Sequence, residues 1–319
     1  MTVEDLPGRH RTEQGLTIQF GPGDADLLAS ADQSATSGSL EAFFMGLRAA
    51  ELAAFPGFDR LISLPMVRDM EVLEHQVHTA RTVLGRMDGR AMLCDEVGLG
   101  KTVEAGLILS ELMLRGLAKS VLVLVPPSLI EQWQAEMRRK FSIELISHDD
   151  PAFDKRSGAG WRDHDRVIAS YHTAKRMPHS EAITGRPWDV VIFDEAHHLR
   201  NRSTLLWRFA SKLSKRYALL LTATPVQNQL DELFNLVTVL EPGLLSTANR
   251  FADRFVDKHD KLSPRNVDQL QELLSEIMVR NRRSTVGLAL TRRWASTLKT
   301  ELSDAERLLY DQIGRASCR

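Results

Sequence analysis

Short apolar runs alternate with longer amphipathic stretches from about residue 60 onward. Five runs of four or five largely apolar or β-branched residues span positions 91–94, 121–125, 167–170, 190–193 and 218–222. Apolar runs of this length are typical of strands buried on both faces of a parallel sheet. The stretches between them are long enough for crossover helices, for example at 102–115 and 128–141. The pattern predicts an α/β fold, with a mostly parallel sheet flanked by helices.

The pattern changes on both sides of this region. The strand signal fades after residue 228, and helical character follows at 230–240, 252–257, 267–280 and 304–312. The first 59 residues are weakly patterned, apart from an apolar-rich stretch at 40–55 that could form one helix. We therefore expect a partly disordered N-terminal extension, an α/β lobe and a helical C-terminal extension, at 1–59, 60–240 and 241–312.

The last seven residues differ in character from the rest. Residues 313–319 read Ile-Gly-Arg-Ala-Ser-Cys-Arg, which resembles the translation of a common sequencing-adapter DNA. We expect this tail to be non-native and the gene to be cut short there, so it is left out of the fold prediction.

Composition is that of an ordinary globular protein. The net charge of the 319 residues is −1, with 43% hydrophobic and 26% charged residues, so a nucleic-acid partner would need a local basic patch. No apolar run approaches the roughly 18 residues of a membrane span, and the N-terminus lacks an apolar signal core, so we expect a cytosolic protein without membrane contact. Two cysteines support neither a disulfide framework nor a zinc site.

A glycine turn follows the first predicted strand. Residues 95–102 read Asp-Glu-Val-Gly-Leu-Gly-Lys-Thr and lead into a predicted helix. Glycines let successive amides face one anion, and the positive end of the helix dipole adds to that field. In a phosphate loop of this kind the lysine neutralises the β- and γ-phosphates and the threonine hydroxyl binds Mg²⁺. The predicted nucleotide ligands are Gly98, Leu99, Gly100, Lys101 and Thr102.

One position departs from the usual phosphate-loop pattern. The chain has Asp95 where the GxxxxGK[ST] pattern has glycine. A chance Gly-Lys-Thr in a surface loop is therefore the alternative, although the strand before it and the helix after it favour the phosphate loop.

Two adjacent acids follow the strand at 190–193. Asp194 and Glu195 end a hydrophobic run, where carboxylates are costly to bury unless a cation or another partner compensates them. Asp194 can hold Mg²⁺ through its water shell, and Glu195 can orient or deprotonate an attacking water. Acids also favour the first turn of a helix, which is the structural alternative. The phosphate loop upstream favours the catalytic interpretation.

These strings resemble the motifs of Swi/Snf-type ATPases of helicase superfamily two. Residues 95–106 are similar to the family's first motif, in which an aspartate before the glycine turn is usual. Residues 194–197 are similar to the DEAH box, and 221–228 to motif III. The residues of the first motif are most similar to those of the bacterial RNA-polymerase-associated branch. The resemblance covers residues 60–310 and implies a RecA-like lobe that binds ATP and Mg²⁺.

The resemblance also implies roles outside the two phosphate motifs. Gln76 would bind the adenine edge through its amide. Motif III, which includes Gln227, would couple the nucleotide site to DNA. Thr222 and Thr224 follow a buried strand and need hydrogen-bond partners, for which His197 is a candidate. A strand end satisfied by its own turn is the alternative.

DNA contacts are expected from two kinds of residue. The segments around Ser128 and Ser170 resemble motifs Ia and Ib, and with Thr173 they offer hydroxyls to a phosphate backbone. Trp133, in the same region, is expected to be structural. The most basic stretch, 279–293, contains no acid and resembles the segment leading out of the first lobe. Its arginines would contact duplex phosphates, or form a solvated surface; those at its start are Arg280, Arg282 and Arg283.

The function implied is Mg-ATP hydrolysis coupled to movement on duplex DNA. Lys101 and Glu195 would be the catalytic residues, and the partners would be DNA and either RNA polymerase or a defence or repair complex, in the prokaryotic nucleoid. In this family a second lobe supplies arginines worth on the order of 10³–10⁵ in kcat, so we expect this chain alone to hydrolyse ATP negligibly. The alternatives are a non-catalytic nucleotide- or DNA-binding module and a small-molecule phosphotransferase.

Overall fold

The computed structural model divides the chain into two units, residues 1–60 and 61–319. In the first, β1 (His10–Arg11) pairs with β2 (Thr17–Ile18) in an antiparallel ladder. The helices expected at 40–55 and 304–312, and the tail, lie wholly or mostly outside the described residues and stay predictions. The residues that the structure describes are 10–11, 17–18, 57–154, 158–224, 230–256, 265–286, 303 and 306–307.

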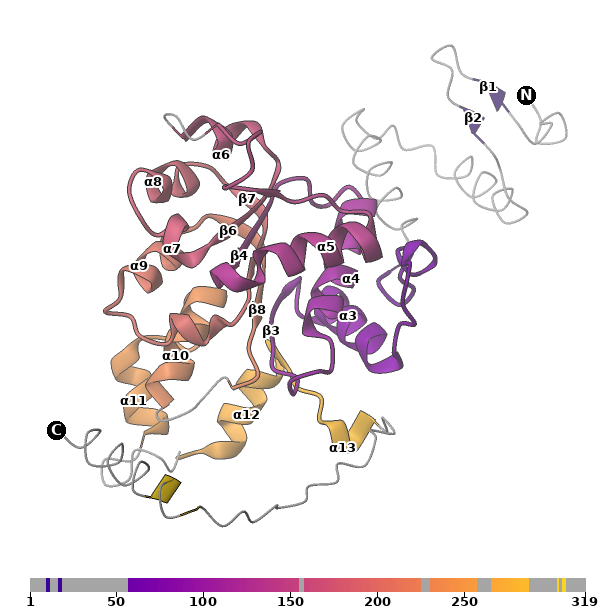
Figure 1. Cartoon of the computed structure of the whole chain (residues 1–319). Helices are drawn as coiled ribbons and strands as arrows, with labels where there is room; N and C mark the ends of the chain where they lie inside the picture. Colours follow the sequence, from indigo (N-terminus) through magenta and orange to yellow (C-terminus); the bar gives the residue numbers. More distant parts are fainter. Residues whose placement is uncertain are drawn as a thin grey trace, which may run out of the picture. The chain divides into compact units, whose positions relative to one another are not determined.

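A seven-stranded sheet forms the centre of the second unit (Figure 1). Its strand order is β5-β6-β4-β7-β8-β3-β9, and every pairing between neighbours is parallel. The α/β prediction is confirmed, and the five apolar runs correspond to five of these strands. The strands are β3 (Arg90–Leu93), β4 (Val121–Val125), β5 (Ile146–Ser147), β6 (Arg166–Ser170), β7 (Trp188–Phe193), β8 (Lys215–Leu221) and β9 (Met278–Val279).

Helices cover both faces of this sheet. Figure 1 shows α3, α4 and α5 on one side and α7 to α10 on the other. Burial on both faces explains why the central strands are apolar at every position, as in β4, where all five residues are buried. The helices are α3 (Glu74–Arg86), α4 (Lys101–Leu114), α5 (Ile130–Phe141), α6 (Ala159–Asp163), α7 (Tyr171–Ala174), α8 (His179–Thr184), α9 (Leu205–Lys212), α10 (Leu230–Leu240), α11 (Ala248–Phe255), α12 (Val267–Ser275) and α13 (Arg283–Val286).

Two short strands of the seven-stranded sheet, β5 and β9, were not predicted. β9 lies in the stretch expected to be helical to residue 280, but α12 ends at Ser275 and Met278 pairs in parallel register with Met92 of β3. A two-residue strand has no periodicity of its own, and its partner lies far away in the sequence. The region predicted as a separate helical extension therefore adds an edge strand to the sheet. None of the helices in the described ranges combines the length and apolarity needed to cross a membrane.

A buried acid on α4 holds the segment that leads into the lobe. The carboxylate of Glu111 accepts hydrogen bonds from the backbone amides of Ile62 at 3.0 Å and Ser63 at 2.8 Å. It also accepts one from Arg115 Nε at 2.7 Å, and both side chains of this ion pair are buried. The helix that starts in the glycine turn is thereby joined to the chain before α3.

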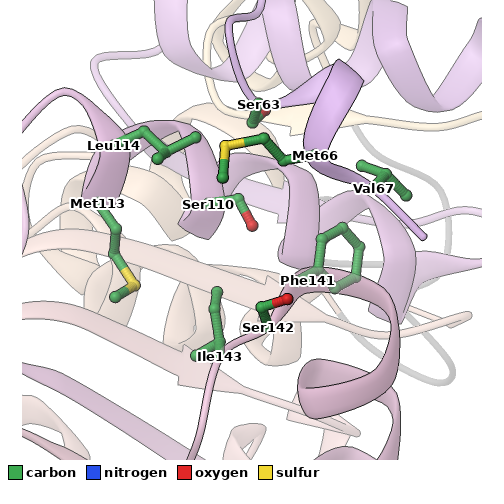
Figure 2. A pocket seen from close by; sticks show the side chains of 9 residues that line it. All are labelled: Ser63, Met66, Val67, Ser110, Met113, Leu114, Phe141, Ser142 and Ile143. Carbon is green, nitrogen blue, oxygen red and sulfur yellow. The ribbon is translucent and has the colours of Figure 1, made fainter.

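An apolar cavity of about 170 Å³ lies beside this attachment (Figure 2). It is formed by the short helix Leu64–Met66, the C-terminal half of α4 and the end of α5. None of the residues predicted to bind nucleotide or DNA lines it. The lining residues are Ser63, Met66, Val67, Ser110, Met113, Leu114, Phe141, Ser142 and Ile143.

Replacing Glu111 by glutamine is expected to destabilise the lobe in a pH-dependent way. Burial raises the pKa of the Glu111 carboxyl, but the amides of Ser63 and Ile62 and the Arg115 guanidinium outweigh it, so the pKa lies below its ordinary value of 4.5. The ionised carboxylate therefore stabilises the fold above pH 4.5, and that stability is lost as the pH falls through the lower folded-state pKa. Urea unfolding should show a loss of roughly 3 kcal/mol at pH 7 that shrinks below pH 4.5.

Glu136→Gln on α5 is the matched control. Glu136 also binds a cation four residues along its helix, Lys140 at 2.7 Å, but no distant backbone amide is recorded on it. The Glu136→Gln substitution should lower the free energy of unfolding by no more than about 1 kcal/mol. Equal losses from the two substitutions, or a Glu111 effect that persists unchanged at pH 3, would contradict the account.

Candidate nucleotide site

Two left-handed glycines shape the turn between β3 and α4. Gly98 and Gly100 have φ of 88° and 90°, which side chains other than glycine rarely adopt, and Gly100 caps the start of α4. A Cβ atom on Gly100 would also lie 2.5 Å from Gln76 Nε2. The turn thus has a backbone shape that only glycine accommodates, at the N-terminus of a 14-residue helix, which is the arrangement that suits an anion.

Asp95 explains why glycine is not required at the first position of the motif. Its φ is not among the positive ones, and its side chain is fully buried. The carboxylate accepts hydrogen bonds from the backbone amide of Asn281 at 2.8 Å and from Asn281 Nδ2 at 3.0 and 3.2 Å. The departure from the common pattern is therefore a buried attachment point, and sequence alone gave no sign of Asn281.

Gln76 lies against the turn from α3. Its Nε2 donates to the carbonyl of Leu99 at 3.1 Å, and its Oε1 accepts from the amide of Leu73 at 3.1 Å. His75 Nε2 contacts the same Leu99 carbonyl at 3.0 Å. The structure thus shows Gln76 supporting the phosphate loop, and its contact with adenine stays a prediction.

A cluster of acids lies buried beneath the loop. One polar atom from each of His75, Asp95 and Glu104 lies within 4.8 Å of the others, and Asn281 Nδ2 reaches Thr79 there at 3.1 Å. Burial is the main cause that raises the pKa of Glu104 to about 9, and the charge of Asp95 adds to it. Glu104 therefore carries its proton at neutral pH, which makes it a poor cation ligand and lets it lie beside Asp95 without charge repulsion.

The two predicted phosphate motifs meet at one edge of the sheet. β3 and β7 are parallel and separated only by β8, so their carboxyl ends point the same way about 10 Å apart. The Lys101 amine donates to the carbonyl of Asp95 at 2.8 Å, and its charge also acts on Asp194. Thr102 follows in the first turn of α4. The predicted lysine and acid therefore lie on the same side of the sheet.

Asp194 is held by donors from three segments. Trp133 Nε1 donates to its Oδ2 at 2.7 Å, and the Glu195 amide donates to its Oδ1 at 2.8 Å. The Tyr171 hydroxyl donates to its backbone carbonyl at 2.6 Å. Burial raises the pKa of Asp194, while Trp133, the Glu195 amide and Lys101 oppose the rise. Trp133 is buried as expected, but its bond to Asp194 was not predicted.

Glu195 adopts an unusual backbone conformation. With φ 49° and ψ 49° it is left-handed, a strained state for a residue with a side chain. Its carboxylate lies 2.9 Å from His197 Nδ1, and both side chains are partly exposed. The turn thus directs Glu195 away from the strand and pairs it with a histidine that can share a proton with it.

The predicted coupling residues are connected differently from expectation. Arg200, just after the DEAH box, donates to Thr224 Oγ1 at 2.9 Å and to the Thr224 carbonyl. Thr222 Oγ1 accepts from the Thr224 amide at 3.3 Å, as in the alternative of a strand end satisfied by its own turn, and His197 Nδ1 lies 2.9 Å from Glu195. The DEAH segment and motif III are therefore joined through Arg200. Gln227 lies outside the described residues.

The predicted DNA ligands differ in availability. Ser128 is exposed before α5. Ser170, however, is buried and caps α7, where its Oγ accepts from the Thr173 amide at 3.1 Å and lies 3.0 Å from Thr173 Oγ1. One hydroxyl hydrogen of the Ser170–Thr173 pair is used between the two side chains, and Ser170 is buried, so exposed Ser128 is the best placed of these three.

The arginines predicted to contact DNA in the basic segment after β9 differ in the contacts they make. Arg280, Arg282 and Arg283 are all exposed. Arg283 lies on the phosphate loop: its amide donates to Glu96 Oε2 at 3.2 Å, and its guanidinium donates to the Val97 carbonyl. The guanidinium of Arg283 is turned towards the nucleotide motif, and its contact with DNA stays a prediction.

A parallel sheet that carries a glycine turn, a lysine and an acid pair at its carboxyl edge defines a nucleotide-binding α/β lobe. Residues 75–318 match the model of the SNF2-related domain, and the chain belongs to this family. It is 44% identical over 262 residues to the uncharacterized ATP-dependent helicase YqhH of Bacillus subtilis (strain 168), covering 82% of this chain and 45% of the relative.

Other relatives are similar over a shorter region. The RNA polymerase-associated protein RapA of Stutzerimonas stutzeri (strain A1501) is 37% identical over 212 residues, which cover 64% of this chain and 22% of the relative. The Sulfolobus solfataricus SWI2/SNF2 ATPase core in complex with dsDNA has the same fold, with a TM-score of 0.59 and 22% identity over 67% of this chain and 45% of that one. The chain thus spans less than half the length of these relatives.

Replacing Asn281 by aspartate should destabilise the loop, because a hydrogen-bond donor is lost and a negative charge is gained. The substitution keeps the side-chain size but removes the amide that donates to Asp95, and it adds a second carboxylate in a buried place. Urea unfolding should show a loss of roughly 3 kcal/mol. Hydrogen exchange at residues 95–99 should accelerate in the same variant.

Asn249→Asp supplies the control, because Asn249 lies in the first turn of α11, at the surface and outside this site. Its unfolding free energy should change by less than about 0.5 kcal/mol. If the Asn281 variant matched this control, the attachment of the segment to Asp95 would carry no stability.

Proposed function

We propose that this chain is the ATP-binding lobe of a Swi/Snf-type, ATP-dependent DNA translocase that uses Mg²⁺. One observation carries the proposal: Lys101, at the glycine turn, and Asp194, at the end of β7, lie at the same edge of one parallel sheet and act on each other electrostatically. A triphosphate with its cation needs that pairing of a cationic loop with a nearby carboxylate.

The residues present fit a magnesium-bound nucleotide. Gly98 and Gly100 give the turn its left-handed backbone at the N-terminus of α4, and Asp194 offers a carboxylate already oriented by two donors. Thr102 and Asp194 would hold Mg²⁺, which when bound supplies positive charge to the β- and γ-phosphates. The loop amides and Lys101 would bind the phosphates directly.

Glu195 is the proposed base for the attacking water. It follows Asp194 directly, and its left-handed backbone turns its carboxylate out of the strand to lie 2.9 Å from His197. There Glu195 can accept a proton from water, and His197 can share it or orient the carboxylate. Arg200, bound to Thr224, would carry a change at the acid pair to motif III.

Duplex DNA is the proposed track. Relatives named as an ATP-dependent helicase and an RNA polymerase-associated protein support this choice, and so does a structure of the same fold in complex with dsDNA. Exposed Ser128, Arg280 and Arg282 are the proposed backbone contacts. RNA polymerase is a candidate protein partner, and association with the nucleoid would follow from DNA binding. Family members usually move along DNA without separating its strands, and we propose the same here.

Substitution of Lys101 by alanine tests the proposal. A fluorescent ATP analogue should bind the 319-residue chain in the presence of Mg²⁺, and the variant should bind it at least about tenfold more weakly, since it loses the phosphate-facing cation. Lys119→Ala is the control, because Lys119 is a strongly exposed lysine paired with Asp165 at 3.3 Å.

Two other results would speak against the motor lobe. Nucleotide binding that is indifferent to Lys101 would remove the phosphate loop from the site. DNA binding that is indifferent to nucleotide, together with no nucleotide binding, would favour a non-catalytic DNA-binding module.

A further inference from the structure

The indole of Trp133 makes an unusual contact for a core residue. Trp133 is 1% exposed and lies in the first turn of α5, yet its Nε1 donates to Asp194 Oδ2 at 2.7 Å. An indole N–H is a donor only, and burying it without a partner is unfavourable. The N–H is the only polar group of this side chain, and it donates a hydrogen bond to one oxygen of the acid that would hold the metal.

Tyr171, on another helix, also donates a hydrogen bond to Asp194. It is the first residue of α7, directly after β6, and its hydroxyl donates to the Asp194 backbone carbonyl at 2.6 Å. One aromatic donor thus holds the side chain of Asp194, and the other holds its main chain.

Both donors come from segments next to the predicted DNA contacts. Trp133 follows exposed Ser128 by five residues, and Tyr171 follows the helix cap Ser170 directly. Neither aromatic residue is available to DNA itself, since both are buried. Their polar atoms are turned inward, to the end of β7.

The geometry points to Trp133 and Tyr171 as positioning residues, which orient the Asp194 carboxylate for Mg²⁺ and so set the metal dependence of nucleotide binding. This inference rests on the proposed function. Groups that hydrogen-bond to a metal ligand typically change metal affinity or activity by 10–100-fold when they are lost, without touching the metal. Trp133 acts on the carboxylate itself and should have the larger effect.

The test replaces Trp133 by phenylalanine, which keeps an aromatic ring and removes the N–H. We expect affinity for a fluorescent ATP analogue in EDTA to stay within about twofold of the wild type, and affinity in saturating MgCl₂ to fall about tenfold. Tyr171→Phe should show a smaller loss of the same kind. Thermal unfolding of each variant checks that it folds.

Trp207→Phe is the matched control. Trp207 on α9 also donates its indole N–H to an oxygen, the carbonyl of Asn235 at 3.0 Å, but outside the nucleotide site. Its variant should bind the analogue like the wild type with and without Mg²⁺. Equal weakening in EDTA and in Mg²⁺ by Trp133→Phe would show a role in the shape of the lobe only, and no weakening would show no role; either overturns the inference.

A second measurement follows Mg²⁺ binding in the wild type, and the variants serve only to assign its signals. The indole N–H signals of the five tryptophans can be resolved by ¹⁵N-labelling, and substitution assigns those of Trp133 and Trp207. Adding Mg²⁺ to the wild type with ADP should shift the Trp133 signal and leave that of Trp207 in place. An unmoved Trp133 signal while Mg²⁺ tightens nucleotide binding would overturn the inference.

The Lys101→Ala variant separates this inference from the function on which it rests. If that variant binds the analogue as well as the wild type, the proposed function fails. If it loses binding while Trp133→Phe keeps its full Mg²⁺ dependence, the proposed function stands and the positioning role of Trp133 fails.

Discussion

The need to supply hydrogen-bond donors to buried carboxylates organises this lobe. Asp95, Glu111 and Asp194 are all buried, and each draws donors from a segment distant in sequence. A buried carboxylate without donors costs several kcal/mol, so these contacts are requirements of the fold. The segments before α3, after β9 and at the starts of α5 and α7 are each tied to the sheet or to α4 by one such acid.

Two of the three acids also lie at the ends of the strands that form the nucleotide site. Asp95 ends β3 and holds the segment that continues into Arg283, whose guanidinium lies on the Val97 carbonyl. Asp194 ends β7 and is held by Trp133 and Tyr171. The phosphate loop and Asp194, the acid proposed to hold Mg²⁺, are therefore each connected to a different part of the lobe, and a change at either one affects different neighbours.

The sequence predicted what depends on local pattern. The five long strands, the glycine turn, Lys101 and the acid pair follow from apolar runs and from residues adjacent in the chain, and the parallel sheet then brings them to one edge. Residues that act across the fold were missed. Asn281 lies 186 positions from Asp95, and Trp133 lies 61 positions from Asp194, so no periodicity or spacing joins them. The same holds for β9, which is too short to have a pattern, and for Arg283, which looks like any basic residue in a basic stretch.

The donors on Asp194 also bear on why an aromatic residue is placed there. A lysine or arginine would satisfy the carboxylate equally well, but its charge would compete with a divalent cation for the same oxygens. A neutral indole N–H stabilises the ionised acid, opposes the rise in its pKa and would leave its charge for the proposed Mg²⁺. Phenylalanine would fill the same space but leave Oδ2 without a donor in a buried place. Tryptophan thus meets two demands of this position at once: it packs in the core on the inner face of α5, and it donates a hydrogen bond without adding charge.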